Sequence, residues 1–167
     1  TSTIGQDLYA VVESEIMFYS DSPLEKIEAI NKKSKSFFKV STKTLVFVIP
    51  IVSFKFEKPL MEEHFNENYL ESEKFPTAKF NGTINEDIDF TKDGTYEASV
   101  TGELTIHGVE QERTIKGTIT IKDGQLIFEG KFDIKLEDHD IDIPSIVIEN
   151  IAEVVEVTTR FVYEPKK

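Results

Sequence analysis

The stretch from Gly102 to Ile121, which reads GELTIHGVEQERTIKGTITI, limits the possible folds of this chain more than any other. Successive side chains of a strand point to opposite faces, so its alternation of apolar and polar residues predicts a β-hairpin with one apolar face. Gly102 and Gly117 fall on that face, where a packed sheet would normally carry side chains. The apolar positions are Leu104, Ile106, Ile115, Ile119 and Ile121.

Similar alternation predicts strands along most of the chain. A first strand over Leu8–Phe18 is expected to turn one set of residues to one face: Ala10, Val12, Ser14, Ile16 and Phe18. A short second strand, Ile27–Ile30, and a third that starts at Phe37 follow it. Four later strands are expected over residues 77–84, 95–107, 125–138 and 153–164.

Two prolines interrupt this series of strands. The apolar segment 44–56 predicts a fourth strand, and Pro50 marks a bulge, an edge or a break within it because proline cannot donate to the ladder. After Pro59 the apolar residues recur at helical spacing and Glu62 lies in the first turn, which predicts a short helix over Leu60–Leu70.

About eight strands joined by tight turns, with one short helix between them, predict an all-β antiparallel fold in a single domain over residues 1–167. Such a sheet loses its exposed edges by stacking or by closing into a barrel. An eight-stranded barrel has an interior just wide enough for side chains or for one small ligand.

Small residues on the predicted inward face bear on what the interior contains. Four glycines share this face with Ala78 and Ala98, and two interpretations of them remain open and compatible. The glycines let the strands bend at barrel corners, or they leave room for a ligand. The glycines are Gly82, Gly102, Gly117 and Gly130.

Charge and composition exclude several functions. The net charge of −12 argues against binding to nucleic acid or to anionic membrane surfaces, because both need basic patches. The absence of cysteine excludes thiol chemistry. The longest apolar run, Leu45–Val52, is too short to span a bilayer as a helix, so no stable membrane insertion is expected.

Three segments resemble the YceI-like family of lipocalin-like β-barrels: FKFEKPLMEEHFNENYLESEKFPTAKFNG, GELTIHGVEQERTIKGTITI and DIPSIVIENIAEVVEVTTRFVYEP. The phrases that carry the resemblance are Phe75-Pro76 followed by Phe80, and Gly102 to Val109. The chain departs from the family pattern near its start, where a His-Ser pair is missing. The resemblance implies an eight-stranded antiparallel barrel, exported by bacteria, with a polyisoprenoid chain in its apolar lumen.

We therefore predict a non-enzymatic binding protein, periplasmic or secreted, that acts as a monomer or homodimer and holds a long apolar molecule such as an isoprenoid or fatty-acyl lipid. A start without Met is compatible with a removed signal peptide. The alternative is a stress-related interaction module with a filled barrel and no lipid ligand. The predicted ligand-binding residues are Phe54, Phe56, Phe80, Val100, Gly102, Leu104, Gly117, Ile119, Phe128, Gly130, Phe132, Val157 and Phe161.

Polar motifs give little support to catalysis or to metal binding, and no metal or cofactor is predicted. His64 lies in an acidic helix without HExxH spacing, and His107 is expected to be a turn residue whose ring bonds backbone. Asp138 and Glu149 have the spacing of the first and last ligands of an EF-hand loop, with Asp140 and Asp142 between them. The glycine that such a loop needs at its sixth position is replaced by Ile143. Metal-assisted hydrolysis at His139 is the weakest of the hypotheses.

Overall fold

The computed structural model describes residues 7–22, 26–142 and 152–166. Its strands are β1 (Leu8–Asp21), β2 (Lys26–Asn31), β3 (Lys35–Lys39), β4 (Thr44–Pro50), β5 (Phe54–Phe56), β6 (Thr77–Ile84), β7 (Gly94–Ile106), β8 (Val109–Lys122), β9 (Gln125–Lys135) and β10 (Val154–Pro165). Its helical segments are η1 (Ile51–Ser53), α1 (Pro59–His64), η2 (Phe65–Tyr69) and η3 (Leu136–His139).

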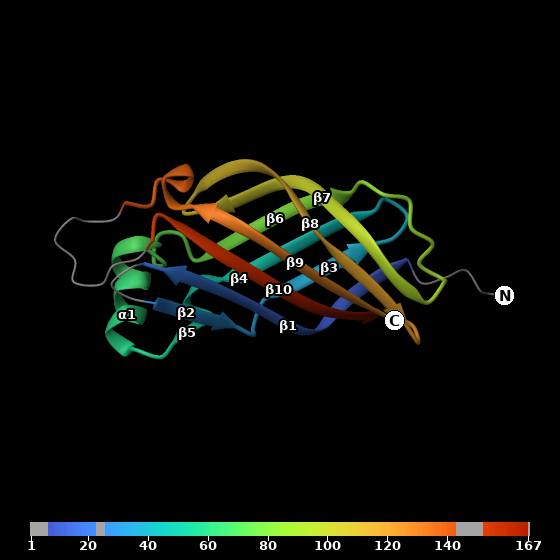
Figure 1. Cartoon of the computed structure of the whole chain (residues 1–167), viewed down its shortest axis with the longest axis horizontal. Helices are drawn as coiled ribbons and strands as arrows, with labels where there is room; N and C mark the ends of the chain where they lie inside the picture. Colours follow the sequence, from blue (N-terminus) through green and yellow to red (C-terminus); the bar gives the residue numbers. More distant parts are fainter. Residues whose placement is uncertain (1–6, 23–25, 143–151, 167) are drawn as a thin grey trace.

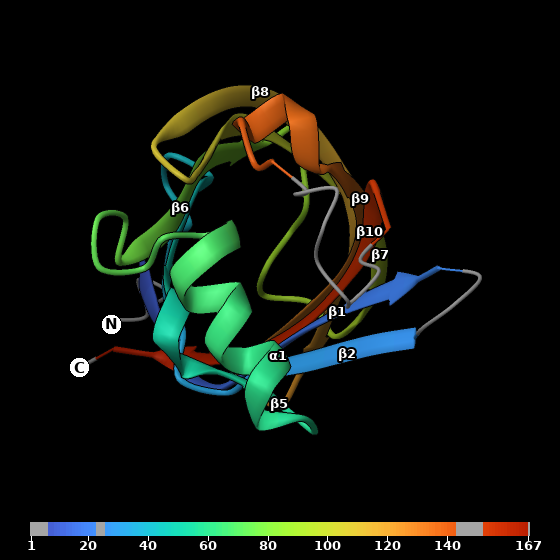
Figure 2. The same cartoon turned by 90° about the vertical axis from the view of Figure 1, so that its left-hand side faces the viewer.

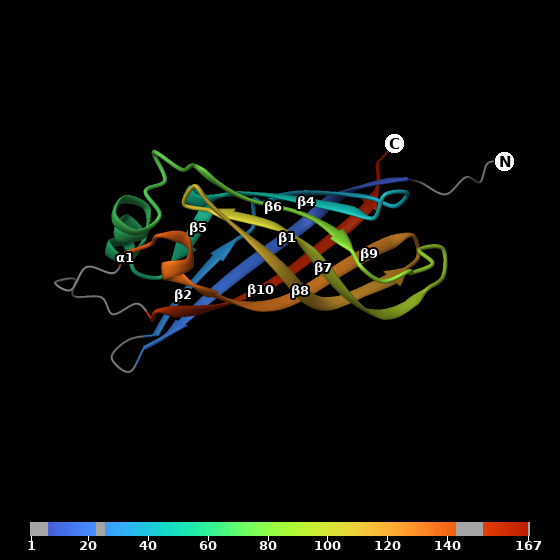
Figure 3. The same cartoon turned by 90° about the horizontal axis from the view of Figure 1, so that it is seen from above.

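Eight of the strands close into an antiparallel barrel, as predicted (Figure 1). Its order is β10-β9-β8-β7-β6-β4-β3-β1, and β1 pairs with β10 to complete the ring. The short strands β2 and β5 extend the sheet from β1 at one end only. Figure 3 shows the start of β1 and the end of β10 at the opposite end of the elongated barrel from α1.

The hairpin of β7 and β8 forms as the alternation predicted. Its strands pair from Gly94–Ile121 to Ile106–Val109, and His107 and Gly108 make the two-residue turn. Both turn residues have positive φ angles, 56° and 73°, which is the requirement of a type I′ hairpin turn. The turn therefore fixes the register that places the apolar parity inward.

One predicted strand face is partly wrong. Tyr9 is buried and Val12 is 57% exposed, although the alternation expected Val12 on the inward face. A β-bulge between Val11 and Glu13 causes the difference, because an extra residue in one strand reverses the parity of the residues before it. After the bulge, Ile16 and Phe18 point inward as expected.

Both prolines lie at the ends of secondary-structure elements. Pro50 ends β4, and the single-turn segment η1 separates it from β5, so the predicted strand over residues 44–56 is broken. Pro59 lies in the first turn of α1, where its missing N–H costs nothing. The predicted helix over Leu60–Leu70 forms as α1 followed directly by one π-helical turn, η2.

The inward glycines bring neighbouring strands unusually close together. Gly82 lies opposite Gly102 in β6 and β7, and Gly117 lies opposite Gly130 in β8 and β9. A Cβ atom added to Gly102 would overlap the Asn81 backbone, and one added to Gly117 would overlap the carbonyl oxygen of Glu129. At these two positions glycine is required for the close approach of two backbones.

Candidate functional site

The half of the barrel near the termini is filled by side chains. Phe38 and Tyr163 are fully buried there and both pack against Phe128, with ring centroids 5.8 and 5.4 Å away. The Tyr163 hydroxyl shares a 2.5 Å hydrogen bond with Ser36, and burial raises the pKa of this tyrosine. Other fully buried residues of this half are Ile84, Ile119 and Leu126. Side chains therefore fill the interior between these strands.

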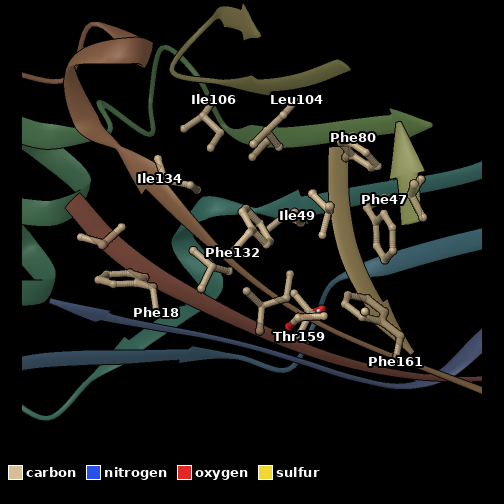
Figure 4. A pocket seen from close by; sticks show the side chains of 18 of the residues that line it. Phe18, Phe47, Ile49, Phe80, Leu104, Ile106, Phe132, Ile134, Thr159 and Phe161 are labelled. Carbon is tan, nitrogen blue, oxygen red and sulfur yellow. Dashed lines mark hydrogen bonds between the residues drawn. The ribbon is translucent and has the colours of Figure 1, made fainter. Parts of the chain in front are cut away.

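The other half contains a cavity of about 160 Å³ that is partly open to solvent and has a lining that is almost entirely aliphatic and aromatic. In Figure 4, Phe18 and Ile134 lie toward one side of this cavity and Phe47 and Phe161 toward the other, with Phe132 and Thr159 between them. A cavity of about 150 Å³ holds benzene, so the space as it stands accommodates about six carbon atoms.

Most of the residues predicted to bind a ligand lie along this cavity. They come from strands β5 to β10, which shows how distant segments of the chain meet at one site. These residues are Phe54, Phe80, Val100, Leu104, Gly117, Phe128, Gly130, Phe132, Val157 and Phe161.

Three predicted residues lie elsewhere. Phe56 belongs to the strand that leaves the barrel, and it packs against Phe65 at a centroid distance of 4.9 Å. Ile119 points inward but lies in the filled half, with no exposed surface. Gly102 faces the backbone of β6, so its missing side chain serves strand bending and adds no volume to the cavity.

Several cavity residues were not predicted. Ile16, Phe18 and Ile49 come from β1 and β4, where a bulge and a continuous apolar run obscured the alternation. Tyr69 and Leu70 come from the end of the helical segment, whose place beside the cavity no local pattern could show. Others are Phe47, Ile51, Phe65, Ile106, Leu136, Ile141 and Val155.

The helical segment lies across one end of the barrel (Figure 2). Phe65 of η2 stacks on Phe18 at 5.4 Å and meets the edge of Phe54 at 5.7 Å. Since Phe65, Tyr69 and Leu70 all line the cavity, this segment separates the cavity from solvent at that end. We call residues 59–70 the helical cap.

Polar contacts hold the neighbouring segments together beside the helical cap. The His107 ring bonds the Glu71 carboxylate through Nε2 at 2.6 Å and the His139 carbonyl oxygen through Nδ1 at 3.0 Å. The Nδ1 atom of His139 contacts the carbonyl oxygen of Val109 at 3.0 Å. The hydrogen bond from His107 lowers the pKa of Glu71. His107 is therefore a turn residue that bonds backbone, as predicted, and it also joins η3 to the loop after the helical cap.

The acidic motif gives no metal site in the part of the chain that the structure describes. Within residues 7–22, 26–142 and 152–166, no three His, Cys, Asp or Glu side chains are grouped to hold a metal ion. Glu149, the last member of the proposed EF-hand spacing, lies outside the described residues, as does the helical turn expected near Ile151. Among the described helices, none is long and apolar enough to cross a membrane.

Comparison with protein families gives a match that covers most of the chain. A model of the YceI-like domain matches residues 13–163. The chain belongs to the YceI-like domain family. This match includes all of β2 to β9 and most of β1 and β10. A comparison with curated proteins finds no match.

Solved structures of YceI-like and related proteins share the fold. A polyisoprenoid-binding domain from Saccharophagus degradans, described as implicated in plant cell wall breakdown, has a TM-score of 0.81 at 13% identity, over 95% of this chain and 98% of that chain. BcnA from Burkholderia cenocepacia has a TM-score of 0.73 at 19% identity, over 89% and 95%. A YceI protein from Campylobacter jejuni has a TM-score of 0.60 at 22% identity, over 81% of each chain. Because these sequence identities are 13–22%, the similarity to these structures shows a shared fold and nothing more.

Proposed function

We propose that this YceI-like protein binds an elongated apolar molecule, such as an isoprenoid or a fatty-acyl chain, in the barrel lumen for transport or storage. The observation that carries the proposal is the cavity, because a barrel that needed only stability would be filled along its whole length. The name of the Saccharophagus degradans domain, which describes polyisoprenoid binding, supports the same class of ligand. We also propose a periplasmic or secreted location, in keeping with the family resemblance, and no enzymatic activity.

The size of the cavity sets a requirement for tight binding. Burial contributes about 0.8 kcal/mol per CH₂ group, so six carbon atoms give about 5 kcal/mol. Association costs about 4–15 kcal/mol, and micromolar binding needs about 8 kcal/mol in addition. A tightly bound ligand must therefore be longer than the cavity of about 160 Å³, so that part of it extends beyond this space.

Native mass spectrometry of protein purified from its own host tests the proposal, together with uptake of an apolar fluorescent probe. We expect a retained adduct of lipid size and a probe signal that the adduct suppresses. A series of alcohols with 6 to 20 carbon atoms should show affinity that rises with chain length. A protein that carries no adduct and admits no probe would support the filled-barrel interaction module instead.

A further inference from the structure

The strands β8 and β9 are paired over only part of their length, and they separate toward the end of the barrel at which η3 lies (Figure 3). Their ladder joins residues 117–122 to residues 125–130 and ends there. Beyond this point, residues 109–116 continue β8 in pairing with β7, and residues 131–135 continue β9 in pairing with β10. These two described segments are neighbours in the ring without strand pairing between them, and we call the wall between them the seam.

Side-chain hydrogen bonds cross the seam in place of a ladder. The Arg113 guanidinium of β8 donates through Nη2 to the carbonyl oxygen of Asp133 in β9 at 2.7 Å. Gln111 donates through Nε2 to the carbonyl oxygen of Asp138 in η3 at 2.8 Å, and the bond from the His139 ring to β8 is the third. Such bonds break one at a time, so this part of the wall opens more easily than a continuous ladder.

The seam forms one side of the cavity. Ile115 lines the cavity from β8, and Phe132 and Ile134 line it from β9. The lining continues to Gly117 and Gly130, the last residues that the ladder joins. Ile115 and Phe132 are only half-buried, although both have the inward parity. The space inside the barrel thus extends to the part of the wall that lacks a ladder.

Arg113 connects the outer side of the seam to the cavity lining. Its guanidinium carbon lies 5.5 Å from the centre of the Phe132 ring, while the same group bonds the Asp133 carbonyl oxygen across the seam. The Arg113 side chain is half-buried. A cation–π contact and a hydrogen bond at the surface are each weak, so Arg113 is able to leave both partners without unfolding of the strands.

The helical cap, which lies across the end of the barrel, is packed more tightly than the seam. Its residues Met61, Phe65 and Tyr69 are all buried. Displacement of the helical cap would expose these three large side chains, and the cost of exposure grows with the apolar area that meets water. Opening of the seam moves side chains that are already half-buried or exposed. The seam is therefore the easier way into the cavity.

We propose that the seam is a lateral entrance to the cavity and that Arg113 is the residue that closes it. A ligand passes between β8 and β9 when Arg113 releases Asp133, and the helical cap stays in place. The inference rests on the proposed function, since it assigns the route by which a ligand reaches the same cavity. The seam also gives room to the part of a long ligand that extends beyond the cavity.

Cross-linking of the seam tests the route. The chain has no cysteine, so introduced pairs react specifically with a short bismaleimide. The pair Thr114→Cys and Asp133→Cys places two thiols on the exposed outer face, one on each side of the seam. In stopped-flow fluorescence with N-phenyl-1-naphthylamine, this cross-link should slow both uptake and release by at least about tenfold. The equilibrium affinity should stay unchanged, because a closed route lowers both rates equally.

A matched control places the same linker where the ladder is intact. Thr120 lies opposite Ile127, both have the outward parity, and neither lines the cavity. The cross-linked pair Thr120→Cys and Ile127→Cys should therefore exchange the probe at the rate of the protein without the linker.

The bond from Arg113 tests the same route without a cross-link. Arg113→Met keeps an apolar chain over Phe132 and removes the bond to Asp133, so uptake and release should both accelerate about threefold to tenfold. Arg113→Lys still carries a donor and should lie between the wild type and Arg113→Met. Glu71→Gln weakens the contact with His107 beside the helical cap and should change neither rate.

Each result has a distinct meaning. Failure of the probe to bind the wild-type protein overturns the proposed function and, with it, this inference. Probe binding with rates that the seam cross-link leaves unchanged, or that both cross-links slow equally, overturns the lateral entrance alone. Faster exchange in Glu71→Gln but not in Arg113→Met assigns the entrance to the helical cap instead.

Discussion

The two halves of one barrel, built from the same strands, have different interiors. In the half near the termini, aromatic side chains from opposite walls meet, as Phe38 and Phe128 do at 5.8 Å. In the other half, β2 and β5 extend the sheet from β1, and the helical cap lies beside the cavity. The filled half contributes packing, and the half with the cavity contains the candidate site. The following predictions test this division, in order of decreasing effect on stability.

The largest difference in stability is expected between variants of two phenylalanines, one in each half of the barrel. Phe38→Ala removes a fully buried ring from the filled half and should lower the free energy of unfolding by about 3–5 kcal/mol. Phe132→Ala only enlarges an existing cavity, so it should cost about half as much or less. Urea unfolding of both variants measures the difference. Equal losses would show that the two halves are packed equally well.

Substitution of two inward glycines by alanine should also lower stability by different amounts. Gly102→Ala forces a Cβ atom against the Asn81 backbone and should destabilise the protein by about 1–3 kcal/mol. Gly130→Ala meets Thr159 Oγ1 at 3.3 Å and Ile115 Cγ2 at 3.6 Å, so we expect a cost below about 1 kcal/mol. Thermal unfolding gives both values. If Gly130→Ala were the more damaging variant, the close backbone contact at Gly102 would not be the stronger constraint.

Filling the cavity should stabilise the protein and impair binding. Ala78→Leu adds carbon atoms beside the cavity and should raise stability by up to about 1 kcal/mol while weakening probe binding about tenfold. Ala29→Leu is the matched control, because Ala29 is buried away from the cavity and a larger residue there should be destabilising. Differential scanning calorimetry and probe titration together distinguish the two. A loss of stability in Ala78→Leu would contradict the presence of an unfilled cavity beside Ala78.

The smallest effect concerns the contact between Glu71 and His107. The pKa of Glu71 in the folded protein lies below its ordinary value of 4.5 because His107 bonds the carboxylate. Its contribution to stability is therefore fully present above pH 4.5 and is lost as the pH falls through the lowered pKa. Glu71→Gln should lack this contribution, so the stability difference between wild type and variant should shrink from pH 6 toward pH 3.

Hydrogen exchange at the β7–β8 turn provides a second measurement of the same contact. The amides of Gly108 and Val109 should exchange faster in Glu71→Gln than in the wild type at pH 6. Asp7, Glu86 and Asp89 also have lowered pKa values, but they retain their partners in the variant. A stability difference that does not change with pH would show that the Glu71 carboxylate contributes nothing.

The antiparallel strands could be predicted from the sequence because their signals are local, and the resemblance to the YceI-like family implied that they close into a barrel. Alternation located the strands, and the turn at His107 and Gly108 joins β7 to β8. The inward parity then identified most of the cavity lining. Prediction failed at Val12 because a bulge depends on the pairing partner β10, and at Phe56 because β5 leaves the ring.

The sequence by itself determined antiparallel strands with one apolar face that carries glycines, and its family resemblance implied that these strands close into a barrel. It could not determine which glycines bend the sheet and which border space, since Gly102 and Gly130 have the same parity and differ only in the strand that approaches them. It also could not place the cavity. Packing depends on side chains that meet across the barrel from distant segments, and the tertiary structure alone decided that Ile119 lies in a filled interior while Thr159 borders an unfilled one.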